Sequence, residues 1–205
     1  MPGWTRPSPG WMGNDMAQQQ HQAGTGTTPP RALRVAIVAD THGFLDPRIA
    51  DEIAECDLAV HAGDIGGAAV LLAMQPREEL VAVKGNGDVP ETWPSHEVHM
   101  LDTLPEEVVL DLPGGQLAVV HGERAGRPAV RHDNLRADYP DVQAIVYGHS
   151  HELVVDDEKT PWVLNPGAAG RTRTKAGPSC LILECSESGW TVQPLRLEPR
   201  KYKAV

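Results

Sequence analysis

The stretch LRVAIVAD, Leu33 to Asp40, decides how this chain folds. It is a nearly continuous apolar run that ends in an acid. A short run of this kind, without polar alternation, is typical of a β-strand buried on both faces, as in a parallel sheet. We therefore predict a buried strand here that opens an α/β fold.

The residues that follow indicate alternating helices and strands. Asp46 and Pro47 have the chemistry of a helix N-cap and first turn, and apolar residues at helical spacing follow them. A strand is predicted over 58–64, a short helix over 66–74 and a third strand over 80–86. This order is β-α-β-α-β, for which right-handed crossovers and a parallel sheet are expected.

The second half of the chain indicates a second sheet. EVVLDLPGGQLAVVHG, residues 107–122, has the pattern of two strands joined by a hairpin at Pro-Gly-Gly. A helix is predicted over 128–139. Further strands are predicted over 142–151, 162–167, 179–184 and 190–197. We therefore expect two packed mixed sheets flanked by helices.

Composition limits the class of function. The chain has 205 residues, of which 40% are hydrophobic and only 4% aromatic, so its core must consist of Val, Leu, Ile and Ala. A formal net charge of -10 argues against a broad surface for nucleic acid or anionic lipid. A small phosphate-bearing substrate would need local positive charge, such as a metal ion.

Two segments of different character are expected. Residues 1–30 are rich in Pro, Gly, Gln and Thr and predict a disordered extension, followed by a folded domain over 31–205.

Cys56, Cys180 and Cys185 lack zinc-type spacing and favour a reduced, cytoplasmic location. No apolar run is long enough to span a membrane, so no membrane partner is expected, and a homo-oligomer is left open.

Polar side chains stand where the predicted strands end. They are Asp40, His42, Asp64, Asn86, His121, His149 and His151. Ligands of open α/β sheets bind at the carboxyl ends of the strands, so we expect these side chains to converge. Asp40 and His42, like His149 and His151, have i, i+2 spacing, which points two side chains to the same side in extended backbone. Each pair is therefore suited to one cation.

The donor atoms indicate which metals the site would take. Carboxylate, amide and imidazole groups suit Mn²⁺, Fe or Zn²⁺, and the lack of cysteine argues against structural zinc. We expect two divalent ions and favour Mn²⁺, with Ni²⁺, Fe or Zn²⁺ as alternatives. Seven ligands exceed the demand of one ion. Asp64 could bridge two ions about 3.5–4 Å apart, as in two-metal hydrolases.

Each motif also has a simpler interpretation. Asn86-Gly87 after an apolar run is a strong signal for a tight hairpin turn, and Gly63-Asp64 is ordinary turn chemistry. A lone His121 is more often a core residue. The hypothesis of a site depends on all of these motifs occurring in order, each at the end of a separate apolar run.

Several other polar residues are expected to lie outside the site. His61 should pack against ligands rather than bind metal. Asn165 could lie beside the metals through its turn, although turn chemistry alone explains Asn-Pro-Gly. The remaining ones are predicted at the surface: His96, His99, His132 and Arg124.

The ordered motifs DTH at 40–42, GD at 63–64, GN at 85–86, HG at 121–122 and GHSH at 148–151 resemble the calcineurin-like metallophosphoesterase superfamily. With NPG at 165–167, the chain looks like its small prokaryotic phosphodiesterases, whose fold is shared with a retromer scaffold subunit. The resemblance implies a four-layer α-β-β-α sandwich. It also implies two sets of ligands around a bridging Asp64: Asp40, His42 and His151 for one ion, and Asn86, His121 and His149 for the other.

The resemblance further implies a reaction. It is hydrolysis of a small phosphodiester by a metal-bridging hydroxide, with Asp64, Asn86 and His121 as the catalytic residues. Many members have a histidine after GN, where this chain has Gly87. That difference favours diesters or activated esters over monoesters. A phosphomonoesterase, a nucleotide hydrolase and a scaffold without activity are the alternatives, although the presence of all seven ligands favours an enzyme.

Overall fold

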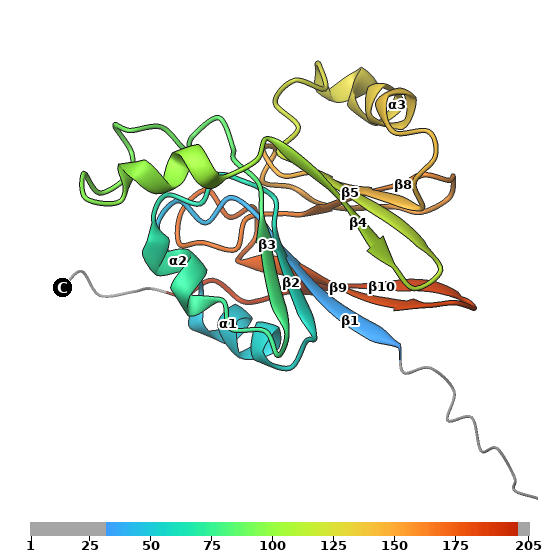
Figure 1. The fold of residues 1–205 in the computed structure, drawn as a ribbon, viewed down its shortest axis with the longest axis horizontal. Coiled ribbons are helices and arrows are strands. Elements are labelled where there is room, and N and C mark those ends of the chain that lie inside the picture. The colour runs from blue at the N-terminus through green and yellow to red at the C-terminus, as the bar shows by residue number, and fades with distance from the viewer. Residues whose placement is uncertain (1–31, 201–205) are drawn as a thin grey trace, which may run out of the picture.

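Two five-stranded mixed β-sheets pack face to face at the centre of the protein, in a computed structural model that describes residues 32–200 (Figure 1). Helices cover the outer face of each sheet. The layers are therefore α-β-β-α, which confirms the predicted fold class. The extension predicted over 1–30 lies outside the described residues.

The first sheet contains the strand that opens the fold. Its order is β10-β9-β1-β2-β3. Strands β1, β2 and β3 run parallel, and β9 is antiparallel to both of its neighbours, β1 and β10. The strands are β1 (Leu33–Val38), β2 (Leu58–His61), β3 (Glu79–Ala82), β9 (Ser179–Ser186) and β10 (Gly189–Arg196). The crossovers contain the helices α1 (Pro47–Ala54) and α2 (Ala68–Ala73).

The second sheet has the order β4-β5-β6-β8-β7, with parallel pairs at its centre and antiparallel strands at both edges. Its strands are β4 (Glu107–Leu112), β5 (Gly115–Val120), β6 (Ala144–Val146), β7 (Leu153–Asp156) and β8 (Trp162–Pro166). Helix α3 (Pro128–Asp138) lies on its outer face, and a 3₁₀ helix (Val98–Thr103) precedes β4 (Figure 1).

Strand β1 is buried on both faces, as its apolar sequence predicts. Val35 and Ile37 belong to the core between the two sheets. Ala36 and Val38, which alternate with them, pack with Ile49 of α1 in the core under the helices. A polar residue at any of these four positions would lose its water without gaining a partner.

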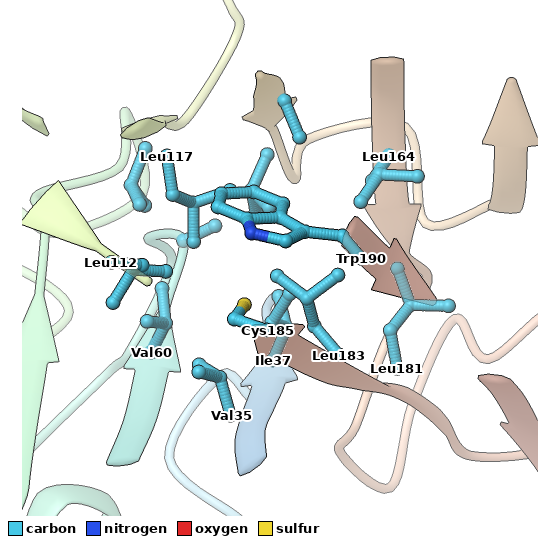
Figure 2. Packing of buried hydrophobic residues seen from close by; sticks show 14 of the residues in the cluster. Val35, Ile37, Val60, Leu112, Leu117, Leu164, Leu181, Leu183, Cys185 and Trp190 are labelled. Carbon is cyan, nitrogen blue, oxygen red and sulfur yellow. The ribbon is translucent and has the colours of Figure 1, made fainter. Parts of the chain in front are cut away.

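The core between the sheets is mainly aliphatic. Figure 2 shows the indole of Trp190, from β10, among side chains of both sheets, with Leu117 and Leu164 on one side and Leu183 on the other. The indole Nε1 donates a hydrogen bond to the Pro113 carbonyl at 2.7 Å. One large aromatic residue thus fills space between the layers while its polar atom is satisfied at the β4–β5 turn.

Helix α1 begins where its sequence indicates. The Asp46 side chain accepts a hydrogen bond from the Arg48 backbone N–H at 3.0 Å, and Pro47 occupies the first helical position. This arrangement satisfies an N–H group that the helix itself cannot pair.

The structure corrects one interpretation and adds two elements. Strand β3 ends at Ala82 and is an edge strand that pairs with β2, so Asn86-Gly87 does not close a hairpin. Strand β7 and the 3₁₀ helix were not predicted. Both are short, and β7 is an edge strand whose pairing with β8 gives no local signal.

Among the described residues, no helix is long and apolar enough to cross a membrane.

Leu183→Ala should destabilise the protein strongly, because Leu183 is fully buried between the sheets. We expect the free energy of unfolding to fall by about 2–5 kcal/mol in urea titrations. Leu72→Ala is the matched control, since Leu72 is 72% exposed, and it should change this free energy by less than about 0.5 kcal/mol. Equal losses in the two variants would contradict the assigned core.

Candidate metal centre

All seven predicted side chains lie at one edge where the two sheets meet. They follow the carboxyl ends of β1, β2 and β3 in the first sheet and of β5 and β6 in the second. The backbone connects these ends directly: Asp40 N–H donates to the Gly63 carbonyl, and Gly148 N–H donates to the His121 carbonyl, both at 3.0 Å. The convergence expected from the sequence is therefore present, whereas the role of these residues as ligands stays a prediction.

Four of the seven form a tight first group. Asp40, His42, Asp64 and His151 each offer one ligand atom, and these atoms lie within 4.8 Å of one another. His42 Nε2 is 3.4 Å from His151 Nε2 and 3.7 Å from Asp64 Oδ2, and His151 Nε2 is 3.5 Å from Asp40 Oδ1. Two carboxylates and two imidazoles at such distances have the geometry of a cation site.

The other three side chains form a second group that meets the other oxygen of Asp64 through His121. His121 Nε2 is 3.3 Å from Asp64 Oδ1, and the His121 and His149 rings meet edge-on with centroids 5.3 Å apart. His149 Nδ1 is 2.9 Å from Asn86 Oδ1. Asp64 thus directs one oxygen toward each group, which is the arrangement that a bridging carboxylate requires.

The backbone at the predicted ligands is unusual. Asp40, His42, Asp64, His149 and His151 have φ between 47° and 64°, in the left-handed region. We expected extended backbone at the two i, i+2 pairs, and this expectation was wrong. The chain after β1, β2 and β6 instead enters a left-handed turn, which bends it and directs side chains to the sheet edge. Non-glycine residues in this region cluster at functional sites, where surrounding contacts hold them.

Buried polar atoms in the site lack partners. Among the described residues, Asp40 Oδ2 and His121 Nε2 are buried and form no hydrogen bond. The Nδ1–H of His121 donates to the Ala62 carbonyl at 2.8 Å, which fixes the ring and leaves Nε2 to face Asp64. Unpartnered buried polar atoms are costly, and divalent cations would satisfy them, one in the first group for Asp40 and one in the second group for His121. The donor set therefore fits metal ions.

The two carboxylates and His121 are electrostatically coupled. Burial raises the pKa of Asp40 to about 7. Burial also disfavours charge on His121, but the Asp64 carboxylate and Asp40 outweigh it and raise the pKa of His121 to about 9. Asp64 is buried as well, yet His121 and the Gly87 N–H lower the pKa of Asp64 to about 2. Without metal, a proton on His121 thus balances part of the negative charge.

The first group keeps its imidazoles neutral. Burial, followed by the charge of Arg173, lowers the pKa of His42, and the same two causes together with His42 lower the pKa of His151 to about 4. Neutral imidazole is the form that binds metal.

The segment KGNGDV packs directly against Asp64. The Gly87 N–H donates to Asp64 Oδ1 at 2.6 Å, and the Asp88 N–H closes a tight turn onto the Gly85 carbonyl at 3.1 Å. A Cβ atom at Gly85 would lie 2.3 Å from Asp64 Oδ1, and one at Gly87 would lie 2.8 Å from it. Both glycines are therefore required for this close approach, although neither has a positive φ.

Two buried residues support the site in a way that sequence reasoning did not predict. Asn165 is fully buried; its Nδ2 donates to the Gly148 carbonyl at 2.7 Å and to Ser150 Oγ at 3.1 Å, which holds the GHSH loop. Asp88 is also fully buried and accepts from the N–H groups of Gly66 and Gly85, both at 2.9 Å. A buried Asn or Asp needs such partners, but the sequence does not reveal its burial.

The other polar residues mostly lie where we expected them. His61 is buried, 2.8 Å from Thr41 Oγ1, and supports the loop after β1. His96 and His99 are exposed, and Arg124 is exposed and paired with Glu106.

The prediction for His132 was wrong. It is half-buried because α3 turns it inward, where its Nδ1–H donates to Asp156 at 2.8 Å and Tyr147 Oη lies 3.1 Å from its Nε2.

Comparisons with known proteins give a consistent result. Residues 33–188 match the Calcineurin-like phosphoesterase superfamily domain. A probable metallophosphoesterase from Methanocaldococcus jannaschii is 27% identical over 145 residues, which cover 66% of this chain and 68% of the relative. The probable metallophosphoesterase YsnB of Bacillus subtilis is 26% identical over 165 residues, 78% of this chain and 89% of the relative.

Solved structures share the fold. A single mutant of Vps29 from Entamoeba histolytica has a TM-score of 0.62 at 18% identity, covering 81% of this chain and 100% of its own. Wild-type Vps29 of the same organism, complexed with Zn²⁺, has a TM-score of 0.60 at 19% identity, covering 80% and 98%. An archaeal phosphodiesterase has a TM-score of 0.57 at 20% identity, covering 80% and 100%.

Mn²⁺ affinity should rise with pH, and binding should release protons. Without metal, the pKa of His121 is about 9 and that of Asp40 about 7, so at about pH 7.5 His121 is mostly protonated and must lose its proton to bind. Isothermal titration calorimetry in two buffers of different ionisation enthalpy measures the protons released. An affinity that falls between about pH 6.5 and 8.5 would contradict this protonation scheme.

Asn165→Ala should weaken Mn²⁺ binding about ten- to a hundredfold, because the GHSH loop loses the side chain that positions it. Calorimetric titration with Mn²⁺ measures the change. Asn134→Ala is the matched control, since the Asn134 side chain also donates to a backbone carbonyl, that of Ala125, but lies on α3. Equal Mn²⁺ affinity in the two variants would show that Asn165 does not support the site.

Proposed function

Because the chain belongs to the calcineurin-like phosphoesterase superfamily, we propose that it is a metal-dependent phosphodiesterase that hydrolyses a small phosphodiester. The coarser activity, phosphoester hydrolysis, is the one that the named metallophosphoesterase relatives support. The preference for a diester is our own inference from the site.

One observation carries the proposal: Asp64 lies between two groups of potential ligands, with one oxygen facing each. The first group offers Asp40, His42 and His151, and the second offers Asn86, His121 and His149. All seven positions of the predicted set carry a side chain that can bind metal.

Two bound divalent ions, for which we favour Mn²⁺, would lower the pKa of a bound water from about 15.7 toward 7 and neutralise the charge on phosphoryl oxygens. The residues of the chain prepare the site for this chemistry. Ala62 and Gly87 fix His121 and Asp64 through backbone hydrogen bonds, so little rearrangement is needed. The acidic chain, of net charge -10, would bind an anionic substrate only through local positive charge of this kind.

The diester preference follows from Gly87. At this position the chain has no side chain that could protonate a leaving group, and Asp64 leaves no room for one. Substrates with good leaving groups, such as diesters of acidic alcohols, are therefore favoured over alkyl monoesters.

A cytoplasmic location stays a prediction; the three cysteines are free and buried.

A scaffold without activity is the alternative from another class. The Vps29 structures show that the fold occurs in proteins named for vacuolar sorting, but the likeness is one of fold alone. The complete set of ligand-type residues favours the enzyme. Hydrolysis assays decide between the two.

Hydrolysis of bis-p-nitrophenyl phosphate should depend on Mn²⁺ and stop in excess EDTA. Asp64→Ala and Asn86→Ala should each lower kcat/KM by more than about a hundredfold, since loss of outer partners alone costs about ten- to a hundredfold. His96→Ala is the control, because the His96 side chain is 79% exposed and pairs with Glu97 rather than with a predicted ligand; it should keep full activity. Turnover without metal, or full activity of the Asp64 variant, would refute the two-metal scheme.

A further inference from the structure

Arg173 is a cation at the candidate metal centre that the sequence motifs do not include. It lies on the exposed loop between β8 and β9, after the NPG turn, and it has φ of 57°. One guanidinium nitrogen, Nη2, lies 2.7 Å from His42 Nε2 and 3.3 Å from His42 Nδ1. The loop thus brings a permanent positive charge to the first group of ligands.

Arg173 has no carboxylate partner within 4.0 Å among residues 32–200, unlike Lys175 of the same loop. On the same loop, Lys175 pairs with Glu152, and the Arg171 guanidinium stacks over the Phe44 ring at 4.1 Å. An arginine without a carboxylate partner at the edge of the candidate metal centre has donors left for a ligand. Its planar fork matches phosphate oxygens.

The contact between Arg173 and His42 competes with metal binding. Arg173 donates to the lone pair of His42 Nε2, the atom that points at Asp64 and His151. A ring nitrogen has one lone pair, so it cannot accept from Arg173 and bind a metal ion together. A metal ion at this position would release Arg173 from His42 and leave its guanidinium at the mouth of the site.

The space around Arg173 can hold a phosphoryl group. A pocket of about 420 Å³ is lined by His42, Asp64, Asn86, Gly87, Thr92 and Arg173, together with Gly66. Arg173 and Gly87 therefore line the same pocket. Gly87 lacks a side chain that could donate a hydrogen bond to substrate. Arg173 provides the guanidinium group in the lining of this pocket.

We propose that Arg173 binds a phosphoryl oxygen of the substrate and supplies the side-chain donor that Gly87 does not provide. This role rests on the proposed phosphoesterase function and assigns a substrate-binding residue to it. Arg173 contacts the phosphoryl group itself, so the role applies to any phosphoester that enters the pocket. It adds positive charge where charge develops on the phosphoryl oxygens.

A purely structural role makes a different prediction. If Arg173 only oriented His42 as a ligand, its loss would weaken metal binding. If Arg173 binds phosphate, its loss should leave Mn²⁺ affinity unchanged or raise it, because a competing donor and a repelling charge are removed.

The test compares Arg173→Gln, Arg173→Lys and a control, Arg171→Gln, which removes the same charge from the same loop. Calorimetry measures Mn²⁺ binding and then the binding of inorganic phosphate to the Mn²⁺-loaded protein. We expect Arg173→Gln to keep Mn²⁺ affinity but to bind phosphate about ten- to a hundredfold more weakly, as for loss of a hydrogen bond to a charged group. Arg173→Lys should recover part of this loss, and Arg171→Gln should resemble the unaltered protein.

Two outcomes would overturn the proposal: unchanged phosphate affinity in Arg173→Gln, or weakened Mn²⁺ binding in that variant. Kinetics with bis-p-nitrophenyl phosphate distinguish a failure of the proposed phosphodiesterase activity from a failure of the proposed role of Arg173. An unaltered protein that binds phosphate through Arg173 but hydrolyses no phosphoester would refute the phosphodiesterase, whereas full hydrolysis with unchanged KM and kcat in Arg173→Gln would refute the role of Arg173.

Discussion

The burial of the Asp64 carboxylate among imidazoles is the interaction on which the site depends. Asp64 is 5% exposed, and its pKa stays low because His121, the Gly87 N–H and His42 offset the effect of burial. Those neighbours come from different sheets: Gly87 follows β3 and His121 follows β5. The packing of the two sheets therefore decides the charge state of the site, and loss of that packing would leave a buried charge without partners.

The tight geometry has a conformational cost that the surrounding structure must bear. Left-handed backbone at the ends of β1, β2 and β6 is unfavourable for Asp and His, and it persists because the flanking strands are held in parallel ladders. The Asn165 side chain holds the GHSH loop in place by a hydrogen bond, and the Asp88 side chain does the same for the turn that carries Asn86. The site is thus built on rigid strands, while the loop that carries Arg173 remains on the surface.

Much of the fold could be predicted because its signals are local. The apolar run of β1, the cap at Asp46 and the Pro-Gly-Gly hairpin each place an element within a few residues of its observed bounds. The edge strand β7 has no such signal, since its register depends on β8. His132 was misplaced for the same reason: its exposure depends on how α3 packs against the second sheet.

The sequence by itself determined the α/β class, the superfamily and the seven side chains at strand ends, because strand periodicity and the order of motifs are properties of the chain alone. Only the tertiary structure decided that Gly87 must be glycine, that Asn165 holds the GHSH loop, and that Arg173 lies against His42. These facts depend on distances between residues far apart in the chain, and such distances exist only once both sheets have packed.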